Sequence, residues 1–389
     1  LSLRRWHALW LSVDGSNAVV GWSHINDAMV SDAPAELAFA LGAPAEPPSP
    51  QSPLVMAATV ADGVAVGHFT GKLEAPVVID RALTDAERSH YLQDEPPGPV
   101  LAAWDFSQQV ASRRGVDVSS AGLHGRTVNS PARGMTGSSW DGSEMSYSRA
   151  PRMYGAMHFH ADDLDDCQWP ACFEWTVPAD ASSGVYALFL EAGGEVENVP
   201  FYVVPPKGKR RADIAVLAST FTYTIYANHA RFEWDKDSDF SRDWRAQAEA
   251  WNAYPHNAGD HREYALSTYN DHLDGSGVSI SSWHRPMLNV RVGFITYPYE
   301  EIRASGLRHF PADTHLTAWL EARGYDFDIV TDWELHSEGV DLLRDYRVVM
   351  TGSHPEYHSP DMLNALQAYR DQGGRLCYMG GNGFYWKIA

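Results

Sequence analysis

Short apolar runs alternate with amphipathic stretches between residues 290 and 379, and this alternation constrains the fold more than any other feature. We expect strands at 290–296, 327–331, 347–351 and 376–379, with helices at 315–323, 339–345 and 362–371. The last helix has the clearest start, because Ser359 stands at the cap, Pro360 at the first helical position and Asp361 in the first turn. Strands joined through helices need crossover connections. The pattern therefore predicts an α/β domain with a parallel, flavodoxin-like sheet.

The N-terminal half instead has short strands separated by turn residues. Strands are predicted at 6–13, 18–22, 55–60, 64–69 and 75–79, with a Pro- and Ala-rich loop at 33–53. Clear strands return at 184–190 and 199–204, and residues 214–218 form a buried-strand run. Short strands at this spacing indicate a jelly-roll-like β-sandwich.

This organisation predicts three domains. Residues 1–94 form a partial β-sandwich, residues 95–206 a second β-rich domain, and residues 207–389 an incomplete α/β domain. Residues 228–285 are rich in Tyr, Trp and His but weakly periodic, and we expect them to cover a site, because long irregular stretches in compact proteins are usually functional. The sequence lacks an initiator Met and stops just after a predicted strand, so we expect both ends to be truncated.

Charge and cysteine content narrow the function classes. The net charge of -20 argues against nucleic acid or an anionic membrane as a partner, since phosphate binding needs a concentrated basic surface. The dense basic run at 207–211 is interpreted as a solvated linker. Only three cysteines occur in 389 residues, which favours a reducing, cytoplasmic location. No apolar run approaches the length of a membrane span.

Two predicted strands run into unusual sequence at their carboxyl ends, where open α/β sheets bind ligands. One continues through residues 351–357 to Tyr357, and the other through the glycine-rich residues 380–386 to Tyr385. The glycine-rich turn has the backbone of a nucleophile elbow, but no Ser or Cys stands at its tip, and Cys377 lies inside the strand. Tyrosinate oxygen suits a hard trivalent metal. The competing interpretation is a packed aromatic residue with a solvated hydroxyl.

Several stretches together resemble the large (beta) subunit of the N,N-dimethylformamidase family. They include the motifs at 124–125, 129–131, 135–142, 154–160, 162–166, 183–186, 218–223, 354–357 and 380–386. Residues 69–87 also resemble the end of a laminin-G or concanavalin-like domain. The C-terminal domain is similar to a class I glutamine amidotransferase-like fold that has lost its cysteine.

The resemblance implies an iron-dependent hydrolase of N-substituted formamides, which converts N,N-dimethylformamide to dimethylamine and formate. In the family, a mononuclear Fe(III) is held by two tyrosines and a glutamate. We place the tyrosines at Tyr357 and Tyr385, with Tyr299 and Tyr346 as substitutes, and expect the glutamate beyond residue 389. The expected partners are a formamide substrate, a small second subunit and further copies of the chain.

Roles for other residues follow from this hypothesis. Glu356 or His354 is expected to act as base or to orient the reacting groups. The predicted substrate-binding residues are Asn382, Tyr264 and Trp283. Tyr269 and His284 are further candidates for the aromatic wall of the substrate pocket. The alternative function is a non-catalytic carbohydrate- or partner-binding β-sandwich module on an inactive amidotransferase-like domain.

A second candidate metal site surrounds His158 and His160. Two imidazoles at alternate strand positions share one face, and acids at 162, 163, 165 and 166 follow them. The competing interpretation, which we favour, is a polar loop at a sandwich edge.

Overall fold

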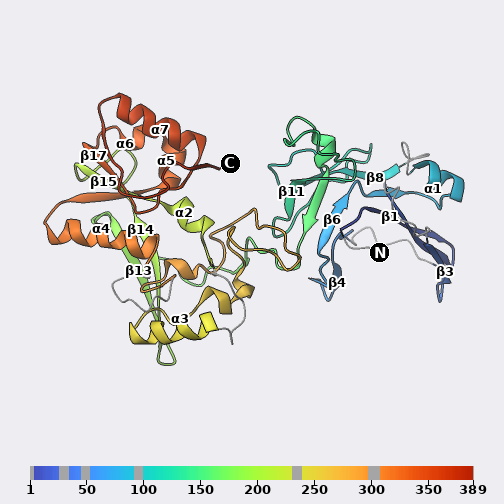
Figure 1. Ribbon diagram of the computed structural model, residues 1–389, viewed down its shortest axis with the longest axis horizontal. Helices are drawn as coiled ribbons and strands as arrows, with labels where there is room; N and C mark the ends of the chain where they lie inside the picture. The colour runs from blue at the N-terminus through green and yellow to red at the C-terminus, as the bar shows by residue number, and fades with distance from the viewer. Residues whose placement is uncertain are drawn as a thin grey trace. The chain divides into compact units, whose positions relative to one another are not determined.

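A computed structural model describes residues 4–25, 35–44, 53–91, 100–229, 239–296 and 307–388. It divides into two compact units, Leu1–Asp163 (unit 1) and Leu164–Ala389 (unit 2). Unit 1 is built from antiparallel sheets and unit 2 around a parallel sheet with helices (Figure 1). This confirms the predicted change from β to α/β architecture. The domain boundaries at 94 and 206 and the named fold families remain predictions.

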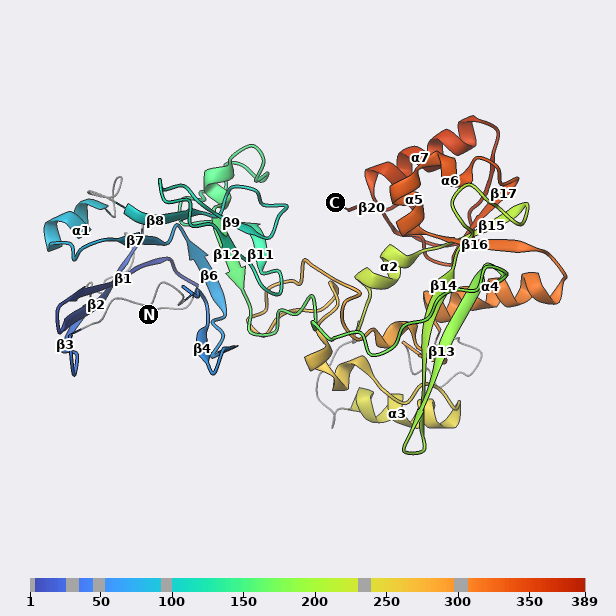
Figure 2. The ribbon, with the colours of Figure 1, turned by 180° about the vertical axis from the view of Figure 1, so that it is seen from behind.

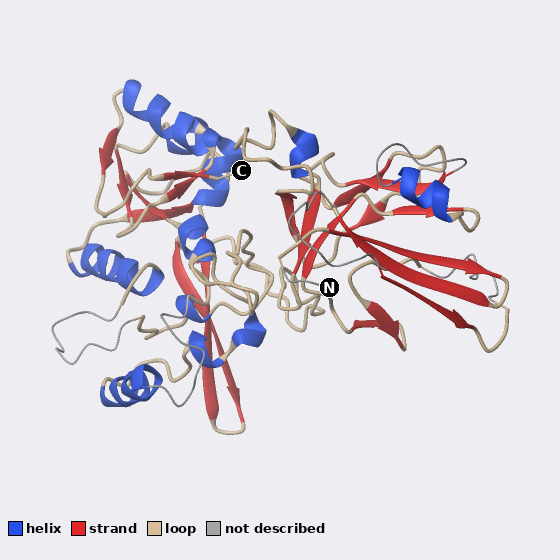
Figure 3. Ribbon diagram, turned by 45° about the vertical axis from the view of Figure 1, so that its right-hand side comes forward, coloured by secondary structure: helices blue, strands red, loops and turns tan. Residues whose placement is uncertain are grey.

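Unit 1 consists almost wholly of strands and loops (Figure 3). Its sheets have the orders β1-β2-β3, β10-β9-β8-β7 and β11-β12-β6, beside a β4–β5 hairpin. Ala102, Trp104, Phe106 and Met157 form a buried core between strands. The bounds are β1 His7–Asp14, β2 Asn17–His24, β3 Ala35–Ala40, β4 Thr59–Ala61, β5 Val64–Val66, β6 Gly71–Glu74, β7 Val77–Ile79, α1 Asp85–Tyr91, β8 Val100–Asp105, β9 Arg114–Asp117, β10 Gly125–Arg126, β11 Ala132–Met135 and β12 Ala156–Phe159.

The prediction of a loop throughout 33–53 was wrong for residues 35–40, whereas the other described residues, 41–44 and 53, are irregular. Residues 35–40 form β3, which pairs antiparallel with β2 from Asn17↔Ala40 to Trp22↔Ala35. Pairing with a neighbouring strand therefore outweighed the low β propensity of this alanine-rich segment.

The parallel sheet of unit 2 has the order β16-β15-β17-β19. Its strands are β15 (Ile214–Ala218), β16 (Phe327–Thr331), β17 (Val348–Thr351) and β19 (Arg375–Cys377). The adjacent helices are α2 (Thr220–Ile225), α4 (Phe310–Ala322), α5 (Asp332–Glu338), α6 (Val340–Leu343) and α7 (Pro360–Asp371). The predicted order, with 347–351 beside 376–379, is confirmed by the pairing of β17 with β19.

Alternate residues of β15 bury on opposite faces of this sheet. Ala215 and Leu217 pack with α5, α6 and α7, whereas Val216 and Ala218 pack with Phe310 and Leu320 of α4. Figures 1 and 2 show these helices on opposite sides of the strands. A central strand that is covered on both faces needs apolar residues at every position, which explains the continuous apolar sequence of β15.

The predicted strand at 290–296 was wrong. Leu288–Val290 is instead a 3-10 helix followed by turns. Phe294 packs with Ala258 and Leu288, while Ile295 packs against Trp244 of α3 (Asp239–Ala250). These apolar residues are therefore used for burial against irregular segments rather than for strand pairing.

The remaining elements of unit 2 are a hairpin and short pieces near the sheet. β13 (Gly184–Ala192) and β14 (Glu195–Val203) confirm the two predicted strands, and they pair antiparallel around Gly193 and Gly194. β18 (Tyr357–His358) pairs with β20 (Trp386–Lys387). Among the described residues, no helix combines the length and apolar character needed to cross a membrane.

Candidate active site

The candidate site lies at the carboxyl ends of β15 and β17. The chain passes from β15 to β16 on one side and later returns to β17 on the other. This reversal is the topological switch point at which open α/β sheets bind ligands. β15 leads into α2, which Tyr226 directly follows, and β17 leads into the turn 352–356, which carries His354 and Glu356.

Two tyrosines converge on the buried carboxylate of Glu356, which is 2% exposed. The hydroxyl of Tyr226 donates to Oε2 at 2.8 Å, and that of Tyr269 faces Oε1 at 3.4 Å. The two phenol rings stack, with centroids 4.2 Å apart and planes 12° apart. The hydroxyl of Tyr357 in turn makes a hydrogen bond with that of Tyr269. Three phenol oxygens and one carboxylate thus gather in one place.

The two tyrosines that face Glu356 both have a raised pKa. Burial is the main cause that raises the pKa of Tyr226, and the negative charge of Glu356 raises it further. Burial likewise raises the pKa of Tyr269, helped by Tyr226 and Glu356. A bound cation would act in the opposite direction, since it stabilises phenolate and carboxylate together. The cluster has the electrostatic character of a cation site.

A histidine and an arginine border the same carboxylate. His354 Nε2 lies 2.9 Å from Glu356 Oε2 and 3.4 Å from Arg308 Nη2. The Arg308 guanidinium stands 4.8 Å from the Tyr226 ring centroid. Burial and the charge of Arg308 lower the pKa of His354 against the opposing effect of Glu356. The lowered pKa favours the neutral form of the His354 ring.

The glycine-rich turn lies alongside the turn that carries Glu356. The N–H groups of Gly381 and Phe384 donate to the carbonyls of Ser353 and Pro355, at 3.2 and 2.9 Å. Glycine is required at 380, because a Cβ there would lie 2.5 Å from the Ser353 carbonyl oxygen. The two predicted strand ends therefore meet through their backbones.

Tyr385 and Asn382 occupy this glycine-rich turn. The N–H of Tyr385 donates to the carbonyl of Glu356 at 3.1 Å, while its side chain is 66% exposed and its ring contacts Trp386. Asn382 is exposed and has a positive φ of 49°. The structure thus brings Tyr269, rather than Tyr385, into hydroxyl contact with Tyr357.

The other predicted residues are more widely spread. Among the wall candidates, Tyr269 reaches the carboxylate; Tyr264 stacks on His261, Trp283 on Trp333, and His284 lies 3.8 Å from Asp166. Tyr346 precedes β17 and donates to Asp328 Oδ2 at 3.0 Å, near the amino ends of the strands. Tyr299 lies outside the described residues.

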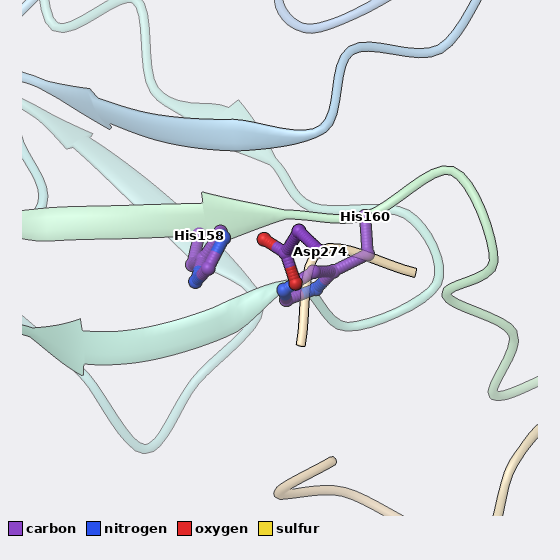
Figure 4. Close-up of side chains that lie close together, drawn as sticks. All are labelled: His158, His160 and Asp274. Atoms are coloured by element: carbon purple, nitrogen blue, oxygen red, sulfur yellow. The ribbon is translucent and has the colours of Figure 1, made fainter. Parts of the chain in front are cut away.

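The second candidate, in unit 1, is the histidine pair that ends β12. The rings of His158 and His160 lie 4.0 Å apart (Figure 4), and His160 Nδ1 lies 3.2 Å from Asp163. Asp274, also labelled in Figure 4, belongs to unit 2. Imidazole and carboxylate are ligand types that a divalent metal accepts.

Sequence reasoning missed Tyr226 and Arg308 and considered Tyr269 only as a wall residue. Tyr226 follows the helix that leaves the central strand, just after the motif at 218–223. Its place at a strand's carboxyl end was the available signal.

Comparison with known proteins gives one consistent family. A model of the C-terminal region of N,N-dimethylformamidase beta subunit-like proteins matches residues 132–389. The N,N-dimethylformamidase beta subunit of Paracoccus aminophilus is 40% identical over 347 residues, which cover 85% of this chain and 44% of the relative. The beta subunit from an Alcaligenes species is 38% identical over 336 residues, which cover 83% of this chain and 42% of that relative. The chain thus spans less than half the length of these relatives.

Proposed function

Because the chain belongs to the N,N-dimethylformamidase beta subunit-like family, we propose that it is the part of an amide hydrolase that carries the active site for N-substituted formamides. The relatives are subunits of an amide hydrolase. The observation that carries the proposal is the convergence of Tyr226 and Tyr269 on Glu356 at the switch point of the sheet. The products would be formate and an amine.

We propose that Tyr226, Tyr269 and Glu356 hold a mononuclear Fe(III). Their oxygen donors are hard and anionic when ionised, and all three meet in a largely buried place. The set also satisfies the expectation of two tyrosines and a glutamate, with Tyr226 and Tyr269 in place of the pair Tyr357 and Tyr385. Glu356 would then replace the glutamate expected beyond residue 389. When bound, the ion supplies Lewis-acid polarisation of the amide carbonyl and lowers the pKa of water.

The base in this proposal is His354. In this proposal His354 donates from Nε2 to Glu356, which lies 2.9 Å away, and the neutral ring would then keep its lone pair on Nδ1. Nδ1 would take the proton of the attacking water and later deliver it to the departing amine. The lowered pKa of His354 keeps the ring ready to accept that proton at neutral pH.

The substrate pocket is proposed to lie between the glycine-rich turn and the segment 228–285. Asn382 would orient the formyl group, and Tyr264 and Trp283 would contribute walls. A small amide offers few contacts, so its binding depends on aromatic surface and on water exclusion. The beta-subunit name of the relatives supports a partner subunit, which we propose is small, and we propose homo-oligomerisation as well.

Amine release tests the proposal. The full-length subunit with its partner is given N,N-dimethylformamide, and dimethylamine is measured for wild type, Glu356→Gln and the exposed control Glu321→Gln. We expect Glu356→Gln to lower the rate by about 100-fold or more and to lose iron, with Glu321→Gln unchanged. A wild type that binds a sugar or protein partner but releases no amine would support the non-catalytic alternative.

A further inference from the structure

Asp313, on α4, has no role in the proposed chemistry, yet its carboxylate contacts the turn that carries His354 and Glu356. Oδ1 accepts from the N–H of Ser353 at 2.5 Å, and Oδ2 accepts from the hydroxyl of Tyr223 on α2. One carboxylate therefore joins α2, α4 and the turn after β17.

Gly352 shows how closely this carboxylate is packed. A Cβ at 352 would lie 2.2 Å from Asp313 Oδ2, which is inside any normal contact distance. The φ of Gly352 is not in the left-handed region, so its backbone conformation is open to other residues. The Asp313 carboxylate therefore occupies the space that a side chain at position 352 would need, which explains the glycine there.

The far end of the same turn is held by a second side chain. Thr222 of α2 is fully buried, and its hydroxyl accepts from the N–H groups of Glu356 and Tyr357, at 3.2 and 3.3 Å. Asp313 fixes the start of the turn and Thr222 its end. His354 and Glu356 belong to this turn, and His354 Nε2 lies 2.9 Å from Glu356 Oε2. The relative position of these two side chains therefore depends on Asp313 and on Thr222.

We propose that Asp313 is a positioning residue that sets the turn 352–356 and thereby aims His354 and Glu356 at the reacting groups. This inference rests on the proposed function, because it assigns the effect of Asp313 to those two residues. Misplacing a catalytic group by about 1 Å costs on the order of 100-fold in rate. A displaced carboxylate should therefore reduce turnover more than substrate binding.

The test is a double-mutant cycle in the iron-loaded, full-length enzyme. Gly352→Ala pushes the carboxylate aside without removing it, Asp313→Ala removes it, and the double variant has no clash left. Asp313→Asn keeps the shape and an acceptor for Ser353. Gly42→Ala, outside the proposed pocket, is the matched control, since a Cβ there meets nothing within 4 Å. The readouts are kcat, KM and the position of the visible iron–tyrosinate absorption band.

We expect Gly352→Ala and Asp313→Ala each to lower kcat about 10- to 100-fold, with little change in KM and a shifted band. The double variant should be no worse than Asp313→Ala, while Asp313→Asn and Gly42→Ala should remain near wild type. The proposal would be overturned if Gly352→Ala lowered kcat by the same factor in the wild type and in the Asp313→Ala variant. If Asp313→Ala does not fold, unchanged kcat and band in Gly352→Ala would overturn it alone. A wild type with neither band nor amine release would instead contradict the proposed function.

Discussion

Glu356 is the centre of the proposed site, because it contacts Tyr226, Tyr269 and His354. It receives a hydrogen bond from Tyr226, faces Tyr269 and holds His354, while its own backbone is anchored to Thr222. A buried carboxylate with this many partners is costly to disturb, since each lost partner leaves an unpaired polar group.

His354 gives a prediction at this scale. We expect His354→Ala to lower kcat by about 100- to 10,000-fold through loss of the general base, while iron stays bound by the three oxygen ligands. His315→Ala, an exposed histidine on α4, serves as control. Steady-state kinetics and iron analysis of the same samples provide the check. Full activity in His354→Ala would remove His354 from the mechanism.

Asp117 gives a prediction about pH and stability in unit 1. Burial alone would raise its pKa, but N–H groups of Ala103, Ser119 and Leu123 and the Ser119 hydroxyl lower the pKa to about 2. The folded pKa is below the unfolded value. This stabilisation is therefore fully present above the ordinary pKa of 3.8 and is lost as pH falls through about 2.

Asp117→Asn should therefore reduce the free energy of unfolding near neutral pH, by about 1–3 kcal/mol, because one acceptor oxygen is lost. Its stability should also change less than that of wild type between about pH 4 and pH 2. Urea unfolding across this range measures both effects. Parallel pH curves for the two proteins would show that Asp117 is not responsible.

The site was only partly predictable from sequence, for reasons visible at single residues. His354, Glu356 and Tyr357 follow a strand in one motif, so local reasoning found them. Tyr226 and Tyr269 are 130 and 87 positions from Glu356 and meet it only after the sheet and the aromatic-rich segment have folded. Tyr385 was chosen because of its turn, but the direction of its side chain depends on packing that the sequence does not show.

At the scale of elements, two helices of unit 2, α5 and α7, begin at residues whose side chains cap them. Ser359 Oγ accepts from the N–H of Met362 at 3.3 Å, with Pro360 as the first helical residue of α7. The helix α5 was not predicted, although Thr331 and Glu334 form a capping box, a pattern that indicates the start of a helix. The false strand at 290–296 shows the opposite error, since apolar content alone does not distinguish a strand from a buried irregular segment.

Ser359→Ala tests the role of the α7 cap. The substitution removes the acceptor for Met362 and also the contact with His336 Nδ1 at 2.7 Å. We expect a loss of about 1–2 kcal/mol in the free energy of unfolding. The exposed Ser337→Ala, inside α5, should cost less than about 0.5 kcal/mol. Equal losses from both, measured by urea denaturation, would show that the cap contributes nothing special.

For the whole molecule, the central question is which tyrosines define its chemistry. The chain combines a β-rich unit with an α/β unit, and its family match spans the end of the first and all of the second. The candidate iron site lies entirely in unit 2. The histidine pair of unit 1 is the competing candidate metal site, and it offers imidazole nitrogens rather than phenol oxygens. The two sites therefore predict different spectra.

The most direct test is the visible absorption of the full-length, partner-bound enzyme, recorded with its iron content. We predict a coloured protein with about one iron per subunit, a band lost in Tyr226→Phe and Tyr269→Phe, and a band retained in Tyr385→Phe and in the exposed control Tyr325→Phe. A colourless wild type without iron would contradict the account. So would a band that survives Tyr226→Phe and Tyr269→Phe but disappears in Tyr385→Phe.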